Sequence, residues 1–109
     1  MVFSDLIGVA TSKNNVTIRL TRERWLHITT AHPEIKASDS LTALDIVGNP
    51  NIVLSGGKDE LLGVKKIRKR VWFVVDKEIT SKDGFILTAY ITTDDKWLFK
   101  RKAMWNRAL

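Results

Sequence analysis

The sequence predicts an α+β fold in which an N-terminal hairpin and two helices pack on a mainly antiparallel sheet. Three observations lead to this prediction. β-branched, roughly alternating residues open the chain, helix-capping residues follow them, and the second half alternates strand-like segments with turn residues. The chain has 109 residues and no internal repeat or linker, so we expect a single domain spanning 1–109.

The N-terminal segments predict a hairpin that leads directly into a helix. Residues 4–12 and 15–20 are apolar and β-branched, and the polar Lys-Asn-Asn between them is a turn signal because asparagine tolerates a positive φ. Thr21 is a candidate N-cap for the helix. The helix should run to about residue 31 or 32, since Pro33 disfavours a helical conformation in the residue before it.

A second short helix is expected over residues 38–48. Ser38 or Ser40 would cap its start, and Gly48 sits near its end. Helical spacing places three apolar residues on one face that should be buried, namely Leu41, Leu44 and Val47.

The second half of the chain predicts most of the sheet. Strands are expected at 51–55, 60–68, 71–79 and 84–93, separated by Gly-Gly and Asp-Gly turn signals. The apolar run within 71–79 suggests a central strand, which should pair with 84–93 as an antiparallel hairpin. Residues 95–107 fit either a last strand or a helix, and the spacing of Trp97, Arg101 and Met104 mildly favours helix.

Charge and composition indicate an anionic partner. The formal net charge is +6, and cations gather at 65–70, at 96–107 and around the segment 19–24. Four tryptophans lie in or near these clusters, which favours a polyanion such as nucleic acid. The alternative is that each cluster is a solvated face that keeps a small protein soluble.

Several classes of protein are disfavoured by what the sequence lacks. Without cysteine there is no disulfide framework, no cysteine-ligated zinc and no thiol nucleophile. No apolar run approaches a membrane span, and the N-terminus lacks the features of a signal peptide. We therefore expect a cytoplasmic protein that needs no cofactor and no metal.

Three segments carry a resemblance to a known family. T-R-E-R-W-L-H-I-x-x-x-H-P-E at 21–34, N-P-x-I at 49–52 and F-I-L-T-A-Y at 85–90 occur in this order. In combination they resemble the phage and bacterial toxin-type members of the barnase/EndoU/colicin/RelE-like ribonuclease superfamily. The resemblance spans about residues 21–105.

The resemblance implies an RNase/RelE-like fold and a metal-independent endoribonuclease that cleaves RNA by attack of the 2′-hydroxyl on the phosphodiester. It also implies a toxin of a toxin–antitoxin or phage-conflict system, with RNA and an acidic antitoxin or immunity protein as partners. The alternative is a nucleic-acid- or protein-binding module without catalysis on the same fold. A nuclease of this kind needs groups that transfer protons and groups that hold phosphate oxygens.

The two histidines of the chain, His27 and His32, are the candidate proton-transfer groups. They are about 140° apart around a helix, so they do not share one narrow face. His27 neighbours Arg24 on a polar stripe and is the first candidate acid or base, with Arg24 as a substrate contact. His32 is the second, although a histidine at a helix end also caps carbonyl groups.

The expected phosphate-binding groups lie on the predicted sheet. Strand alternation would place Lys66, Arg68 and Arg70 on one face, which could bind phosphate. The resemblance implies a catalytic role for Arg68, with Lys66 and Arg70 as substrate contacts. The alternative is a charged sheet edge that prevents aggregation. Alternation over 84–93 sends Phe85, Leu87, Ala89 and Ile91 to the core and leaves Thr88 and Tyr90 on the polar face.

Thr88 gains a catalytic, phosphate-contacting role from the resemblance, whereas β-propensity alone would explain its place on a strand. Tyr90 and Lys100 complete the expected substrate contacts. The tryptophans, which could stack on bases, fit a core or a partner interface better in a chain this small.

Overall fold

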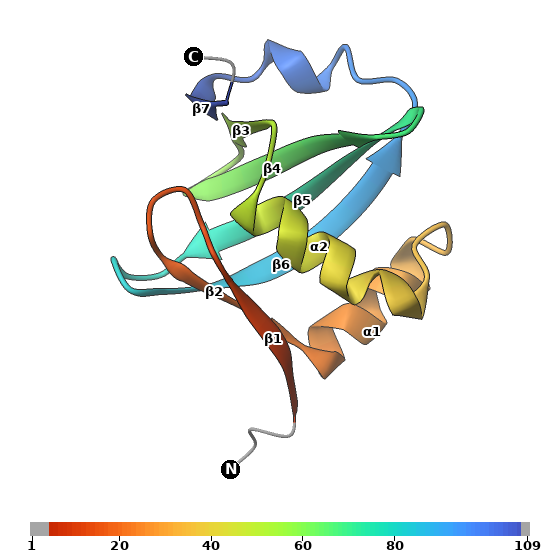
Figure 1. Ribbon diagram of the computed structural model, residues 1–109, viewed down its shortest axis with the longest axis vertical. Coiled ribbons are helices and arrows are strands. Elements are labelled where there is room, and N and C mark those ends of the chain that lie inside the picture. Colours follow the sequence, from red (N-terminus) through yellow and green to blue (C-terminus); the bar gives the residue numbers. More distant parts are fainter. Residues whose placement is uncertain (1–4, 108–109) are drawn as a thin grey trace.

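The structure is a computed structural model that describes residues 5–107 and forms an α+β fold with two α-helices and a seven-stranded mixed sheet (Figure 1). The elements in chain order are β1 (Leu6–Thr11), β2 (Thr17–Thr21), α1 (Arg22–Ala31), the 3-10 turn η2 (Ala37–Asp39), α2 (Ser40–Gly48), β3 (Ile52–Ser55), β4 (Glu60–Ile67), β5 (Arg70–Glu78), β6 (Asp83–Thr92), the 3-10 turn η3 (Leu98–Lys100) and β7 (Ala103–Asn106). None of the described helices has the length and apolar composition needed to cross a lipid bilayer.

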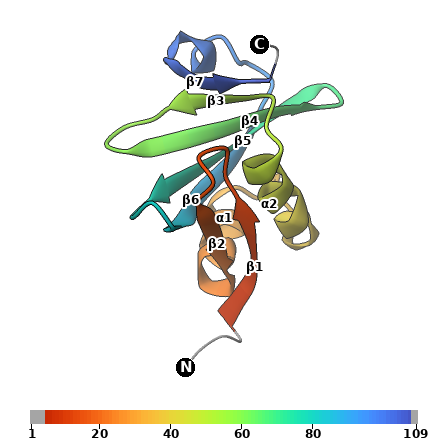
Figure 2. The ribbon, with the colours of Figure 1, turned by 60° about the vertical axis from the view of Figure 1, so that its left-hand side comes forward.

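The sheet order is β1-β2-β6-β5-β4-β3-β7. Neighbouring strands are antiparallel except β2 and β6, which run parallel. The long strands β4, β5 and β6 cross the middle of the molecule, with β1 and β2 at one end and β3 and β7 at the other (Figure 2). β5 is therefore central, as the apolar run in its sequence predicted.

The predicted hairpin and first helix are confirmed. β1 and β2 pair antiparallel, and Asn15 takes a positive φ of 65° in the turn that joins them. Thr21 is the N-cap of α1, and its Oγ1 accepts a hydrogen bond from the Arg24 backbone amide at 3.2 Å. His32 is the C-cap, so the helix ends before Pro33 as expected.

The second helix is present, but its cap and its buried face differ from the prediction. Asp39 occupies the N-cap position instead of Ser38 or Ser40, and its side chain accepts a hydrogen bond from the Lys36 amide, one turn earlier. Leu41 is 71% exposed. The buried residues, Ala43, Leu44, Ile46 and Val47, centre on a stripe about 140° around the helix from Leu41.

The C-terminal segment forms no α-helix. The chain makes the single turn η3, and β7 then pairs antiparallel with β3. The mild preference for a helix, drawn from the spacing of Trp97, Arg101 and Met104, was wrong. The reason is that Leu98, fully buried, anchors the turn on the sheet and frees the following residues to extend along β3.

The sheet has a hydrophobic core on each face. One face, which we call the helix face, packs against α1 and α2 through Trp25, Ile28 and Ile46, and includes Trp72 and Val74 of β5. The other, which we call the open face, has a smaller core whose described members are Leu54, Leu62, Val64, Val71, Phe73, Val75 and Leu98. Among the described residues, the segment around η3 packs on the open face through Leu98, whereas two helices cover the helix face.

A β-bulge in β6 decides which of its side chains reach the open face. Val75 pairs with Thr88 and Asp76 pairs with Ile86, so Leu87 is an extra residue opposite β5. The predicted single apolar face of Phe85, Leu87, Ala89 and Ile91 was therefore wrong. Ile86, Ala89 and Ile91 pack on the helix face, and Leu87 packs on the open face beside Tyr90.

Candidate functional site

A groove of about 600 Å³ lies on the open face of the sheet. Its floor comes from β4, β5 and β6, and its wall comes from the segment that leads into and out of η3. Its lining includes the polar and aromatic residues Glu60, Phe73, Thr88, Tyr90, Thr92, Trp97 and Arg101. The bulge contributes directly, because it puts Leu87 on this face next to Thr88.

Aromatic rings form a continuous row along the groove. Tyr90 stacks on Phe73, its cross-strand partner, with ring centroids 4.7 Å apart and an interplanar angle of 16°. Trp97 meets Phe73 edge-on at 5.5 Å and remains 45% exposed. His32 meets the other side of Tyr90 edge-on, at 4.3 Å between ring centroids. The row ends in an exposed indole at one end and an imidazole at the other.

The polar groups of the groove are hydroxyls, one guanidinium and one carboxylate. Thr88 and Tyr90 supply hydroxyls, while the Thr92 hydroxyl already donates to the Asp94 carbonyl at 3.0 Å. Arg101 Nη1 donates to the Ser55 carbonyl at 3.4 Å, which holds the guanidinium at the wall. Glu60 is the one carboxylate among the described lining residues.

Two lysines share the open face with the groove. Lys66 pairs with Val71, and Lys77 pairs with Glu60, so each side chain lies on the same face as its partner. Neither lysine lines the groove itself. Together with Arg101 they place positive charges around a floor that is mainly apolar and includes the rings of Phe73 and Tyr90.

His32 is the predicted imidazole that the fold brings to the groove. As the C-cap of α1 it is placed at the β6 end of the helix, and its Nδ1 lies 3.8 Å from Glu34 Oε2. It is not itself a lining residue, but it contacts Tyr90, which lines the groove together with Thr88.

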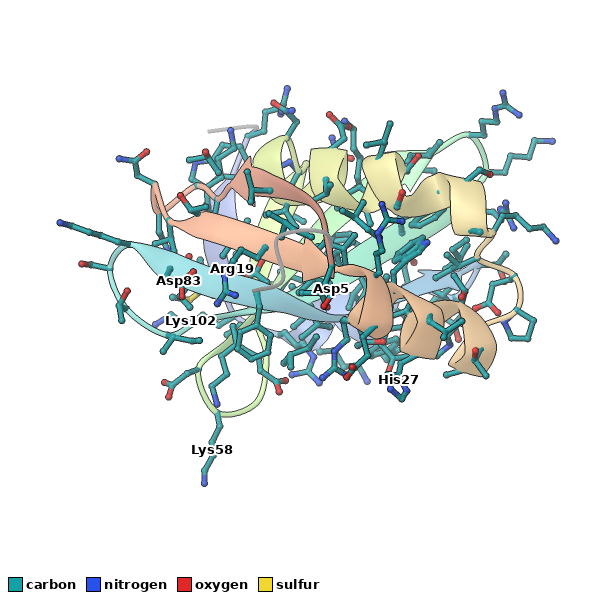
Figure 3. All side chains as sticks on the ribbon, turned by 90° about the horizontal axis from the view of Figure 1, so that it is seen from below. Asp5, Arg19, His27, Lys58, Asp83 and Lys102 are labelled. Carbon is teal, nitrogen blue, oxygen red and sulfur yellow. The ribbon has the colours of Figure 1, made fainter. Side chains whose placement is uncertain are left out.

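His27 is exposed and is not among the described residues that line the groove. Figure 3 shows its ring projecting from α1 in the same direction as Lys58, in the turn before β4. It therefore flanks the groove side of the molecule, while His32 contacts the groove's own residues.

The expected cationic face of Lys66, Arg68 and Arg70 does not form. Arg68 lies in the two-residue turn between β4 and β5 with a φ of 59°, so strand alternation does not apply to it. Arg70 pairs with Ile67, which packs on the helix face, whereas Lys66 pairs with Val71 on the open face. Lys66 and Arg70 thus point to opposite sides of the sheet.

The remaining predicted contacts lie apart from the groove. Arg24 lines a separate hollow with Arg19 and Phe85, on the side of α1 that faces the start of β6. Lys100 is an exposed residue of η3, and the neighbouring Arg101 lines the groove in its place. The C-terminal cationic cluster thus contributes one residue to the groove, Arg101. The sequence interpretation had used α-helical spacing for this segment, and a 3-10 turn does not follow that spacing.

Sequence reasoning missed Glu60, Phe73 and Arg101 as members of one site. Phe73 was hidden in an apolar run whose two faces are both buried, and the sequence of a central strand does not show which face is the open one. Within residues 5–107, no three His, Asp or Glu side chains gather in a way that could hold a metal ion. Comparison of the chain with protein-family models, curated proteins and solved structures finds no match.

Proposed function

We propose that this protein is a metal-independent endoribonuclease that binds RNA in the open-face groove. The observation that supports the proposal best is the convergence in one groove of the Thr88 and Tyr90 hydroxyls, the Arg101 guanidinium and an aromatic row that ends at His32. The resemblance of segments 21–34 and 85–90 to ribonuclease toxins supports the same proposal, including its RNase-like fold and an acidic antitoxin as inhibitor.

The chemistry assigns a role to each kind of group. The RNA 2′-hydroxyl loses its proton and attacks the adjacent phosphorus, the bond from phosphorus to the 5′-oxygen breaks, and that oxygen takes a proton. The products end in a 2′,3′-cyclic phosphate and a 5′-hydroxyl. His32, whose ring contacts Tyr90 at the edge of the groove, would be the imidazole that transfers a proton.

Residues in the wall and floor of the groove can stabilise the negative charge that develops on the phosphate. Negative charge grows on the phosphoryl oxygens during attack, and Arg101 can hold those oxygens with a fork of N–H donors. The hydroxyls of Thr88 and Tyr90 can orient the same group from β6. The exposed Trp97 and the Tyr90 ring offer surfaces on which bases stack, worth roughly 1–3 kcal/mol per base.

The test is cleavage of a labelled RNA in EDTA, with end-group analysis of the products. Fragments that end in 2′,3′-cyclic phosphate are expected, and the 2′-O-methyl form of the same RNA should bind without being cut. Arg101→Ala should lose cleavage, while Lys58→Ala, a change in an exposed turn residue, should keep it. Cleavage that persists unchanged in Arg101→Ala would contradict the proposed site.

A second candidate is a nucleic-acid-binding module without catalysis. It is favoured by one specific observation, that the predicted catalytic residues His27, His32 and Arg68 are not among the residues that line the groove, although His32 contacts Tyr90. Such a module would bind RNA and the 2′-O-methyl RNA equally and release no products. Its affinity would fall with salt in proportion to the number of phosphate contacts.

A further inference from the structure

A small cavity of about 60 Å³ lies on the helix face, beneath the turn that joins β1 and β2. It is separate from the open-face groove and shares no lining residue with it. Its polar lining comes from the turn residues Ser12, Lys13 and Asn14 and from Asp76 and Glu78 of β5. A space of this size, with polar walls, has room for water.

Asp76 is the unusual residue of this cavity. Only 4% of its surface is exposed, and among residues 5–107 no group hydrogen-bonds to its Oδ1. A buried carboxylate without partners is strongly disfavoured, so a carboxyl in this position tends to keep its proton. Burial, and then the negative charge of Glu78, raise the pKa of Asp76 to about 7.

Glu78 fastens the turn to the sheet. Ser12 Oγ donates to Glu78 Oε2 at 2.9 Å, and Asn14 Nδ2 donates to Glu78 Oε1 at 3.1 Å. These two hydrogen bonds join the turn to β5 right beside Asp76. Any change in the charge next to Glu78 therefore acts on the attachment of the turn.

The charged groups that face the cavity are few. Lys13, from the turn, has its Nζ 4.8 Å from the centroid of the Trp105 ring, at the β7 wall. The lining residues from α2, β3, β4 and β7 carry no titratable side chain. On the neighbouring strand β6, the residue paired with Asp76 is the apolar Ile86. Glu78 and Lys13 are thus the charged residues of the described lining besides Asp76. A lysine at the wall and a Glu78 already engaged by two donors make a proton a better occupant of this site than a metal cation.

We propose that Asp76 and the turn above it form a proton switch. With its proton, Asp76 is neutral and the turn stays fastened to Glu78. Without the proton, two neighbouring carboxylates repel each other, water enters to solvate Asp76, and the turn from Ser12 to Val16 detaches from β5. The turn is therefore closed in acid and opens as the pH rises through neutrality.

The switch also reaches the groove through the backbone. Asp76 pairs with Ile86, and the next pair along β5 is Val75 with Thr88, so the bulge lies beside the switch. Opening at Asp76 loosens the backbone that holds Thr88 on the open face. The switch itself does not depend on what the groove binds.

The experiment combines two NMR measurements on the full chain. The carboxyl ¹³C shift of Asp76 is followed from pH 4 to 9, and amide hydrogen exchange of residues 12–16 is compared at pH 6 and pH 8, after correction for intrinsic exchange. We expect a midpoint near 7 and a roughly tenfold or greater loss of protection in the turn at pH 8. The Asp76→Asn variant should keep the turn protected at both pH values.

Two further variants keep the proposal testable if Asp76→Asn does not fold. Glu78→Gln removes the like charge, so the Asp76 midpoint should fall and the loss of turn protection between pH 6 and pH 8 should be smaller than in the wild type. Asp5→Asn, an exposed acid away from the cavity, should behave as the wild type (Figure 3). A midpoint below pH 5, or turn protection that does not change between pH 6 and pH 8 in the wild type, would overturn the switch.

Discussion

The two faces of the sheet differ in how they are covered. On the helix face, α1 and α2 bury a continuous core that takes in both ends of β2 and the middle of β5. On the open face, a single segment anchored by Leu98 covers part of the strands and leaves a groove lined by aromatic rings. The same central strand thus contributes to folding with one set of side chains and to binding with the other.

Strand alternation in β5 separates the side chains that pack under the helices from those that face the groove. Trp72 and Val74 point to the helix face, and Phe73 and Val75 point to the open face. A substitution in the first set should act on stability, whereas one near the groove should act on RNA.

The largest effect is expected at the imidazole end of the aromatic row. His32→Ala should lower the rate of RNA cleavage by roughly 10²–10⁴-fold, since a positioned proton-transfer group typically contributes that much. The fold should persist, because the hydrogen bond that caps α1 comes from the His32 backbone N–H, which the substitution keeps, and the side chain is not part of either core. Single-turnover cleavage kinetics measure the change, with His27→Ala as the matched control that retains more activity.

The helix face should respond in stability instead. Ile46→Ala removes a fully buried side chain of α2 and should lower the free energy of unfolding by about 2–5 kcal/mol, because the cavity it leaves cannot fully collapse. Urea unfolding followed by tryptophan fluorescence measures this loss. RNA affinity at a temperature where the variant stays folded should equal that of the wild type. A large loss of affinity there would show that the two faces are not separable.

The pH dependence of stability should come largely from Asp76. Its folded-state pKa is raised to about 7 from 3.8, so between these values the unfolded chain has lost a proton that the folded chain keeps. The free energy of unfolding should therefore fall as the pH rises from about 4 to 7, by up to about 4 kcal/mol. Asp76→Asn should remove this slope, as measured by urea unfolding at several pH values. A wild type whose stability rises over that range would contradict the assignment.

The smallest effect is expected at the exposed end of the groove. Trp97→Ala should weaken RNA binding by about 1–3 kcal/mol, the usual contribution of one stacked base. Stability should change little, because the indole is 45% exposed and meets the core residue Phe73 edge-on. Fluorescence anisotropy with a 2′-O-methyl RNA measures the affinity without cleavage. Phe99→Ala, an equally exposed aromatic residue outside the described groove lining, is the control.

Local sequence signals predicted the elements of this fold well. Thr21 and Pro33 bounded α1, the Asn-rich turn joined β1 to β2, and the apolar run of β5 indicated its central place. Those signals act between neighbouring residues, so they are visible in the chain alone. The parallel pairing of β2 with β6 joins Thr17 to Asp83 and left no such signal.

The candidate site was predicted only in part, for two physical reasons. Alternation placed Thr88 and Tyr90 on one face correctly, but the bulge at Leu87 reversed the prediction for the first half of β6. Arg68 was expected on a strand, but it lies in the two-residue turn that joins β4 to β5. A bulge and a turn each shift the side-chain register by a residue, and periodicity cannot place either one beforehand.

The parallel pairing of β2 with β6 also has a consequence for how the chain acquires its shape. The N-terminal hairpin and both helices are synthesised before β6. The hairpin can join the rest of the sheet only after β6 has been made, because β2 pairs with β6. Contacts between segments so distant in sequence are slow to form, because a long loop must close first. The groove, whose floor includes β6 and whose wall includes Trp97 and Arg101, is thus completed only after these later segments have been synthesised.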